Sequence, residues 1–383
     1  MRKIISLLLL SSAILTSHAY ADYEAGLIAA DKQDYATALR EWKPLAEKGD
    51  RRAQYKVAIL YHHALGVNQD YAEAAMWYRK AAEQGEAISQ FSLGAFYYRG
   101  LGVTKDYNQA LSWLSKAAEQ NLPVAQYQLG IMNELGEGVP KNSPQALIWF
   151  RKAAELGDAE SQVHLGNIYF SGAGVPKDDA QAVAWFRKGA MQGDAEGQLN
   201  LAFMYYTGKG IKEDRRQAFE WYSKAAEQGQ ALAQFYLAVM YEKGDATPQD
   251  YAKAVFWFRK AAEQGDATSQ FYMGEFNANG IGVPKSLSSA LNWYRAAAVQ
   301  GNGNAQLAMG KMYEKGIEVA QNKVVACALY TLAASSNTKT AKANRDTILT
   351  TMSAQSTDAA QKLAVKLAEP GNLLKAIEQN REQ

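Results

Sequence analysis

Histidine and cysteine, which often ligate metals or act as bases and nucleophiles, are scarce in this chain. The sequence holds four histidines and one cysteine. His62 and His63 are adjacent, so on a helix they would diverge by about 100° and make a poor metal pair. His164 stands apart from the others, and His18 lies in the N-terminal segment. Because no Ser-His-Asp order or zinc-type spacing stands out, we expect no catalytic residue, no metal site and no cofactor.

A glycine-rich sequence, Gly172-Ala173-Gly174-Val175, invites comparison with a phosphate-binding loop. Such loops follow a β-strand, whereas these glycines follow a helical pattern, and similar sequences recur along the chain. Paired glycines also suit a sharp turn that needs positive φ. The sequence therefore predicts a turn between two helices.

Tryptophan spacing identifies the elements that must position these residues. Seven tryptophans lie 36 residues apart, and the eighth, Trp42, is one residue off the period. A fixed period of this size is typical of a repeat array. The array divides into eight blocks: 50–85, 86–121, 122–157, 158–193, 194–229, 230–265, 266–301 and 302–337.

Each block predicts a pair of helices. The fifth residue of every block is glutamine, and apolar residues at helical spacing follow it, which predicts a first helix of about 12 residues. The second helix starts at a column of good N-cap residues: Asp70, Asp106, Asn142, Asp178, Asp214, Asp250, Ser286 and Asn322. It ends at a column of glycine or asparagine, which tolerate the left-handed C′ position: Gly85, Asn121, Gly157, Gly193, Gly229, Gly265, Gly301 and Asn337. The chain is therefore predicted to be an all-α solenoid of antiparallel helix pairs.

The second helices carry an aromatic pair, as in Trp185-Phe186-Arg187-Lys188. We interpret both aromatic residues as core residues that seal one helix pair against the next, with ligand stacking by the tryptophan as the alternative. Cys327 occupies a column that is apolar in the other blocks. It is expected to be a small buried residue rather than a reactive thiol.

The two ends of the array differ from the blocks. Residues 22–49 predict an incomplete first repeat, and residues 338–383 predict capping helices and a polar, helix-prone tail. Residues 1–21 resemble a secretory signal, with Arg2 and Lys3, an apolar run, and Ala19-Tyr20-Ala21 as a cleavage site. The alternative, an uncleaved anchor, is less favoured because the run is shorter than the ~20 residues of a span. The expected location is the periplasm, or the cell surface or medium.

Charge argues against one class of partner. Loss of Arg2 and Lys3 with the signal would reduce the 41 basic residues to 39, against 39 acidic residues. A neutral chain lacks the electrostatic footprint of a nucleic-acid binder. No later stretch is apolar enough to predict a membrane span.

The repeated motif resembles the Sel1-like repeat (SLR), a relative of the tetratricopeptide repeat. The resemblance is carried by Leu165-Gly166, Tyr169 and Gly172-Ala173-Gly174-Val175, with Trp149-Phe150 to Gly157 in the preceding block. It covers about residues 50–337 and implies a right-handed superhelix that acts as a protein-binding scaffold. Exported bacterial members are commonly envelope adaptors, or factors that engage host proteins.

A cysteine-rich branch of the same family has been associated with penicillin binding and β-lactam hydrolysis. That branch carries a cysteine pair in each repeat, and this chain has a single cysteine. The resemblance therefore does not imply that the chain is an enzyme.

In related arrays the first helices line a groove, which makes the variable columns on those helices candidate partner-binding positions. Aromatic residues in the middle blocks have the character of interface hot spots, and we expect an extended peptide or helical surface of another protein to bind around blocks 2 to 5. The alternative is that these aromatic residues only pack between neighbouring helix pairs. The candidates are Tyr98, Arg99, Glu134, His164, Phe170, Phe203, Tyr206, Tyr236 and Glu242.

Overall fold

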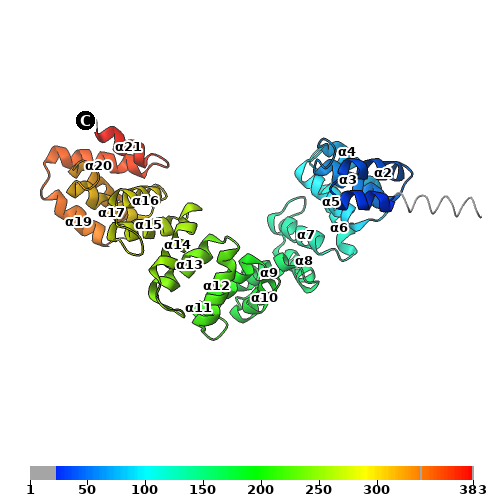
Figure 1. Cartoon of the computed structure of the whole chain (residues 1–383), viewed down its shortest axis with the longest axis horizontal. Helices are drawn as coiled ribbons and strands as arrows, with labels where there is room; N and C mark the ends of the chain where they lie inside the picture. The colour runs from blue at the N-terminus through cyan, green and yellow to red at the C-terminus, as the bar shows by residue number, and fades with distance from the viewer. Residues whose placement is uncertain (1–22, 337–338, 382–383) are drawn as a thin grey trace, which may run out of the picture. The chain divides into compact units, whose positions relative to one another are not determined.

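The structure is a computed structural model and describes residues 23–336 and 339–381. The predicted signal and the predicted C′ residue Asn337 lie outside these residues. Throughout the described ranges the regular elements are helices, in consecutive antiparallel pairs (Figure 1). The chain forms two compact units, Met1–Gly189 and Ala190–Gln383, and the boundary between them falls inside one helix.

The first unit begins with a helix over 23–31. Its other helices are α2 (Tyr35–Glu47), α3 (Arg51–His62), α4 (Tyr71–Glu83), α5 (Ala87–Arg99), α6 (Tyr107–Glu119), α7 (Pro123–Leu135), α8 (Ser143–Glu155), α9 (Ala159–Ser171) and α10 (Asp179–Met191), which crosses the boundary. Within the eight blocks, which begin with α3, odd-numbered helices are the first helices and even-numbered helices are the second.

The second unit continues the same pattern. Its helices are α11 (Ala195–Thr207), α12 (Arg215–Glu227), α13 (Ala231–Lys243), α14 (Tyr251–Glu263), α15 (Ala267–Asn279), α16 (Leu287–Val299), α17 (Gly303–Lys315), α18 (Lys323–Ser335), α19 (Lys339–Leu349), α20 (Ala354–Ala368) and α21 (Leu373–Arg381). The residues at the end of the chain, predicted to be a polar, helix-prone tail, form the helix α21, which also buries Leu373, Ala376 and Ile377. The apolar spacing of these three residues was the available signal.

The predicted helix boundaries rest on side-chain caps. Asp70 and Asp106, for example, accept hydrogen bonds from backbone N–H groups in the first turns of α4 and α6. The C′ residues take positive φ, as at Gly157 (95°) and Asn121 (59°). The glycine-rich turn does the same, with φ of 76° at Gly172 and 77° at Gly174. The turn interpretation is therefore confirmed.

One glycine column allows the two helices of a pair to approach closely. A Cβ added at Gly166 would lie 2.5 Å from the ring of Phe186, and one at Gly274 would lie 2.3 Å from the ring of Tyr294. The buried residue of each second helix, aromatic in every block except the second, where it is Leu114, thus rests on the glycine or alanine of its first helix. This contact sets the spacing of the pair, since packed interiors leave no room for an added methyl group.

The tryptophans correct the interpretation of the aromatic pair. Trp42 and Trp77 are buried, whereas Trp185 and the later ones are half-buried. The residue after the tryptophan is the core residue, as with Phe150, which is fully buried. The outer face of the indole instead carries a lysine three residues on, with Lys188 Nζ 3.8 Å from the Trp185 ring centre.

The invariant glutamines join one helix pair to the next. Each is buried, and its Nε2 donates to a backbone carbonyl eight residues earlier, as from Gln54 to Ala46 (3.0 Å) and from Gln234 to Ala226 (3.1 Å). The uncharged amide satisfies a backbone carbonyl group near the end of the preceding helix. This hydrogen bond explains why the position accepts a buried polar residue.

Cys327 is buried, and burial raises the pKa of its thiol. This setting agrees with the interpretation as an apolar core residue. Among the described helices, none combines the length and apolar character that crossing a membrane requires.

Candidate functional site

Aromatic rings in the second unit form a ladder along its first helices. It begins with Tyr206 at the end of α11, whose ring centre lies 6.2 Å from that of Tyr222 and 6.0 Å from that of Tyr236. Tyr222 and Tyr236 are stacked at 5.0 Å. Offset and edge contacts of this kind stabilise by about 0.5–1.5 kcal/mol each beyond the area they bury.

The ladder continues through α13, α15 and the second helices behind them. The ring centre of Phe235 lies 5.3 Å from that of Tyr236 and 5.9 Å from that of Phe258. Phe258 in turn stacks on Tyr272, with ring centres 4.7 Å apart. Phe271 then lies 6.0 Å from Tyr294. Three of these rings (Tyr222, Phe258 and Tyr294) are buried, and the others (Tyr206, Tyr236, Phe235, Tyr272 and Phe271) remain partly exposed. The five partly exposed rings all belong to the first helices α11, α13 and α15.

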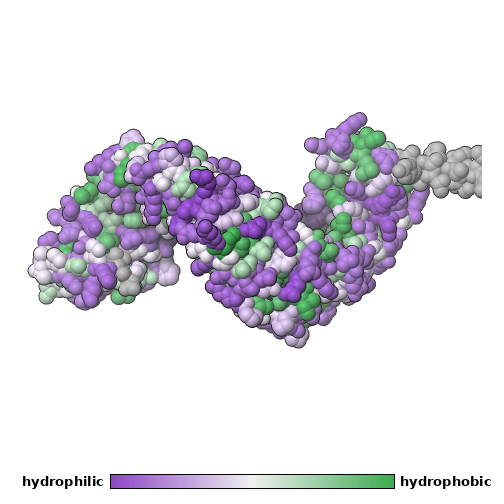
Figure 2. Space-filling model, turned by 90° about the horizontal axis from the view of Figure 1, so that it is seen from below, coloured by the Kyte–Doolittle hydropathy of each residue, from purple (hydrophilic) through white to green (hydrophobic). Residues whose placement is uncertain are grey.

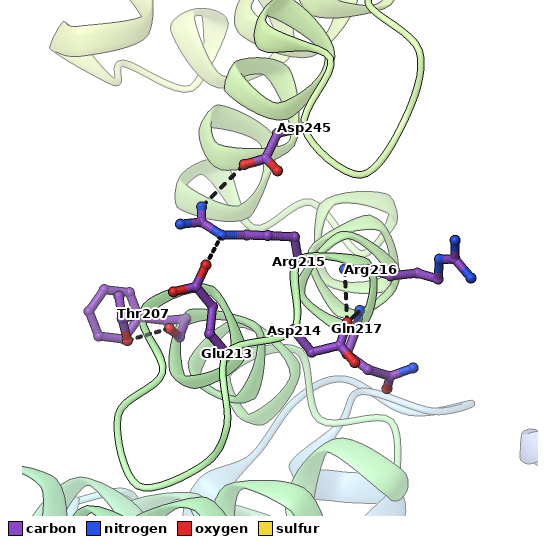
Figure 3. Close-up of polar contacts among 8 residues, drawn as sticks. Thr207, Glu213, Asp214, Arg215, Arg216, Gln217 and Asp245 are labelled. Atoms are coloured by element: carbon purple, nitrogen blue, oxygen red, sulfur yellow. Dashed lines mark hydrogen bonds and ion pairs between the residues drawn. The ribbon is translucent and has the colours of Figure 1, made fainter.

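Arg215 contacts the first ring of this ladder and two carboxylates beside it. Its guanidinium carbon lies 3.9 Å from the ring centre of Tyr206, while its nitrogens contact Glu213 Oε1 at 2.7 Å and Asp245 Oδ2 at 3.1 Å. Figure 3 shows Arg215 between these two carboxylates, which come from the loops that follow α11 and α13. The arginine therefore ties two adjacent blocks together and orients Tyr206.

The other end of the ladder opens into a hollow of about 280 Å³ between α15, α16 and α17. Its walls include Phe271 and Tyr294, the small residues Ala278 and Ala308, and the charged residues Glu275 and Lys311. We call this cavity the ladder hollow. Its volume lies near the lower end of the range of small ligand sites and suits one or two side chains of a partner.

Two substitutions between repeats explain the ladder hollow. Ala308 occupies the column that holds Tyr236 and Tyr272 in the two preceding blocks. Ala278 occupies the column that holds Tyr206 two blocks earlier. Where the aromatic side chains are replaced by methyl groups, the same backbone leaves room for an apolar ligand group.

The charges at the ladder hollow are arranged asymmetrically. Tyr294 donates a hydrogen bond to Glu275 Oε1 at 2.5 Å, and burial together with this carboxylate raises the pKa of Tyr294. Lys311 is exposed at the opposite side. One carboxylate is thus already engaged, while the ammonium group faces solvent, which favours a ligand with an apolar group beside an acidic one.

Tyr98 lies in a different arrangement in the first unit. Its hydroxyl donates to Glu137 Oε2 at 2.5 Å, and Tyr107 donates to the other oxygen of the same carboxylate at 3.0 Å. The hydrogen bond to Glu137 and burial raise the pKa of Tyr98 to about 12. Tyr98 therefore connects two blocks, which makes it part of the scaffold as well as of the surface. Arg99 follows it at the exposed end of α5.

His164 and Glu134 come together as neighbours. His164 Nε2 lies 3.4 Å from Glu134 Oε2, which is ion-pair distance, although the two groups form no hydrogen bond. The imidazole also lies 4.2 Å from the ring of Phe150 and 5.8 Å from that of Tyr127. This cluster is mixed in character and half-buried.

Among the remaining candidates, Phe203 packs against the same core cluster as Tyr206 and Tyr236, and Glu242 lies near Tyr272. Phe170 and Phe203 each sit beneath a lysine, with Lys177 Nζ 5.4 Å and Lys209 Nζ 5.3 Å from the respective ring centres. Glu242 is half-buried, and burial raises its pKa. Of the nine candidates, Tyr206 and Tyr236 share the ladder, and Glu134 and His164 share a cluster in the first unit.

Sequence reasoning missed the ladder hollow, because it searched for clustered aromatic residues. The signal was present in the same columns as an absence of aromatic residues at Ala278 and Ala308. Lys311 was also absent from the candidates, although it lies in the same column as the candidate Phe203. The binding role of the nine candidates stays a prediction.

No cluster of three or more metal-ligating side chains occurs within the described residues. The two adjacent histidines differ from expectation, because their rings stack with centres 4.1 Å apart rather than diverging. His62 Nδ1 lies 3.3 Å from the hydroxyl of Tyr78, and burial together with His63 and Arg99 lowers the pKa of His62. These contacts are typical of a structural histidine.

The surface of both units mixes polar and apolar residues. Figure 2 shows hydrophobic residues scattered among hydrophilic ones on the face in view. Several large apolar side chains are exposed, including Ile88 and Val124 in the first unit and Leu232 and Phe256 in the second. Isolated exposures of this kind are common, so the ladder and its hollow are the more informative feature.

The repeat can now be compared with known families. The Sel1 repeat matches residues 51–86, 87–122, 123–158, 159–194, 195–230, 231–266, 267–302 and 303–337. The chain belongs to the Sel1 repeat family. Family members are usually scaffolds for protein–protein interaction rather than catalysts.

Two solved structures support this assignment. The chain is 34% identical to c5321, a protective antigen present in uropathogenic Escherichia coli strains that displays an SLR fold. That similarity covers 97% of this chain and 88% of c5321, with a TM-score of 0.57. It is 33% identical to a Sel1 repeat protein from Oxalobacter formigenes, over 81% of this chain and 89% of that one, with a TM-score of 0.59. No curated protein matches the chain.

Proposed function

We propose that this Sel1 repeat protein is an exported adaptor that binds another protein of the cell envelope through the first-helix face of its second unit. The observation that carries the proposal is the aromatic ladder that ends in the ladder hollow. Aromatic residues around a small, desolvated recess are the composition of binding hot spots.

The shape of the site indicates how the partner binds. Partly exposed rings give many modest contacts along α11, α13 and α15, and the hollow admits an apolar anchor at one end. An extended segment or one face of a helix presents side chains in such a row. An apolar side chain beside a carboxylate would use both the hollow and Lys311.

The relation to c5321 favours a second candidate. That relative is a protective antigen, and the similarity extends over nearly the whole chain. A protein exposed to a host could use the same face to bind a host protein. Both candidates need export, for which the N-terminal sequence is the support.

Photo-crosslinking in living cells tests these proposals. A photoreactive phenylalanine at Ala308 would report from the ladder hollow, and the same residue at the exposed Phe256 is the matched control on a second helix. We expect Ala308 to capture a defined protein and Phe256 to capture none. Recovery of the adduct in the periplasmic fraction would support the envelope adaptor, whereas an adduct formed only with host cells would support the second candidate.

Equal crosslinking from both positions would contradict the proposal. It would show that the first-helix face is no more engaged than the rest of the surface. An adduct recovered only in the cytoplasm would refute export.

A further inference from the structure

The invariant glutamines have a second partner that is missing in the third and eighth blocks, where Gln126 Oε1 and Gln306 Oε1 have no hydrogen-bond partner among the described residues. In most blocks a glutamine at the end of the second helix reaches back 30 residues to the buried glutamine of its own block. Gln84 Nε2 lies 2.8 Å from Gln54 Oε1, and Gln120 Nε2 lies 2.8 Å from Gln90 Oε1. The same bond joins three further pairs in the second unit, each at 2.8 Å: Gln228 to Gln198, Gln264 to Gln234 and Gln300 to Gln270.

The donating nitrogen in several blocks bridges two oxygens. Gln84 Nε2 also contacts the carbonyl oxygen of Gly49 at 3.1 Å, and Gln120 Nε2 contacts that of Gly85 at 3.1 Å. This second acceptor is the C′ residue of the preceding block. The repeat therefore builds a site for one planar N–H donor, and its own glutamine fills that site.

The third block lacks the donor. Leu156 occupies the position of Gln84 and Gln120, and its side chain is exposed. Gln126, the buried glutamine of this block, is only 2% exposed, and its Nε2 donates to Ala118 as in the other blocks (3.1 Å). Its Oε1 has no hydrogen-bond partner among the described residues. An unsatisfied buried carbonyl oxygen costs about 1–3 kcal/mol.

A pocket of about 330 Å³ lies beside Gln126. Gln126 and Asn121, the C′ residue that corresponds to Gly49 and Gly85, both line it. Glu119, Glu155 and the indole of Trp149 complete its polar and aromatic walls, together with Lys152. We call it the amide pocket.

Charge selects the kind of donor that fits. The lining of the pocket holds two acidic side chains, Glu119 and Glu155, and one basic side chain, Lys152. The pocket also lies at the C-terminal ends of α6 and α8, each of which carries about −0.5 of an elementary charge. The sum is negative, so a cationic donor is favoured over a neutral amide.

Geometry then separates the two common cations. A guanidinium is planar, presents five N–H donors and stacks on aromatic rings, whereas an ammonium is a compact point charge. Lys152 already sits over the Trp149 indole, with Nζ 4.7 Å from the ring centre. The acceptors set for a planar amide nitrogen match a guanidinium better than a second ammonium.

We propose that the amide pocket binds the arginine side chain of a partner protein. The guanidinium donates to Gln126 Oε1 and to the carbonyl of Asn121, as the glutamine amide does in neighbouring blocks, and its charge is met by Glu119 and Glu155. This site lies in the first unit and is independent of the ladder hollow, so either site can fail its test without affecting the other.

The test uses the full chain labelled with 5-fluorotryptophan and three short capped peptides, Gly-Arg-Gly, Gly-Lys-Gly and Gly-norleucine-Gly. The fluorine resonance of Trp149, assigned with Trp149→Phe, is followed by NMR. We expect a saturable shift with the arginine peptide and binding at least tenfold weaker with the other two. Equal response to the lysine or norleucine peptide would overturn the proposal.

Two variants decide whether the missing amide creates the site. Leu156→Gln restores the internal donor and should weaken arginine binding at least tenfold. Gln264→Leu removes the donor opposite Gln234, where Glu227, Glu263, Trp257 and Lys260 repeat the other walls. It should add a saturable response at the Trp257 resonance. Undiminished binding to Leu156→Gln, or a folded Gln264→Leu variant without a new response, would refute the proposal.

Discussion

The two units use the same backbone repeat to present different first-helix faces. In the second unit, aromatic rings at neighbouring columns contact one another from Tyr206 to Tyr294. In the first unit, the corresponding columns form separate clusters, such as Tyr98 with Glu137 and His164 with Glu134. Since caps, turns and close contacts are shared, the difference lies in a few side chains per block. The scaffold and the binding surface can therefore be varied independently.

The largest expected effect comes from the buried ring that follows the tryptophan, a core feature that both units share. Phe258→Ala removes a buried ring that lies in the ladder, and should cost about 3–5 kcal/mol of stability in the second unit. Phe150→Ala should cost a similar amount in the first unit. Trp257→Ala should cost less than Phe258→Ala, since the indole is half-exposed. Hydrogen exchange measured separately for amides of each unit distinguishes these losses.

An equal or larger loss for Trp257→Ala would restore the interpretation of both aromatic residues as core residues. It would also mean that the lysine over each indole covers a buried surface. The ranking of the two adjacent residues in one helix is therefore the decisive observation.

The ladder hollow is the feature that distinguishes the first-helix face of the second unit, and it can be filled by substitution. Ala308→Tyr extends the ladder with the residue found in the same column at Tyr236 and Tyr272, and so fills the ladder hollow. Crosslinking from a photoreactive residue at Tyr272 should then fall at least tenfold, which corresponds to about 1.4 kcal/mol of binding free energy. Gln128→Tyr places the same residue in the same column of the first unit and should leave crosslinking unchanged. A matched loss with both variants would show that the hollow has no special role.

The sequence predicts the scaffold well because its determinants are local. Helix caps such as Asp106 and C′ residues such as Gly157 act within a few residues of themselves, and the period multiplies their signal eight times. The candidate site is harder to predict from the sequence, because it depends on contacts between blocks. Tyr98 donates a hydrogen bond to Glu137, which lies 39 residues later, and Ala308 leaves a cavity beside it. Neither contact can be inferred until neighbouring helices are placed side by side.

A smaller effect is expected at the amide pocket. Leu156→Gln supplies the hydrogen bond that Gln126 Oε1 lacks, and should stabilise the first unit by about 1 kcal/mol. Leu156→Asn, whose side chain is one methylene shorter, is the control and should stabilise less. Urea unfolding followed by hydrogen exchange in each unit measures both. A neutral or destabilising Leu156→Gln would indicate that the Gln126 oxygen is already satisfied by solvent.

The smallest effect concerns a carboxyl group beside the ladder. Burial raises the pKa of Glu242 above that of an unfolded chain, so its contribution to stability is fully present below its unfolded pKa and is lost as pH rises through the folded value. At pH 7 the ionised side chain therefore weakens the second unit. Glu242→Gln should stabilise that unit at pH 7 by roughly 0.5 kcal/mol or less, and should change nothing near pH 3.

Glu134 in the first unit provides the matched comparison for this last variant. Its carboxylate lies 3.4 Å from His164, so Glu134→Gln removes a favourable contact and should not stabilise the first unit at pH 7. Opposite signs at the two positions would show that the ladder side of the repeat disfavours charge, while the mixed cluster of the first unit uses it. Equal stabilisation at both would mean that the two faces do not differ in their tolerance of a carboxylate, and the contrast between the units would then rest on the aromatic contacts alone.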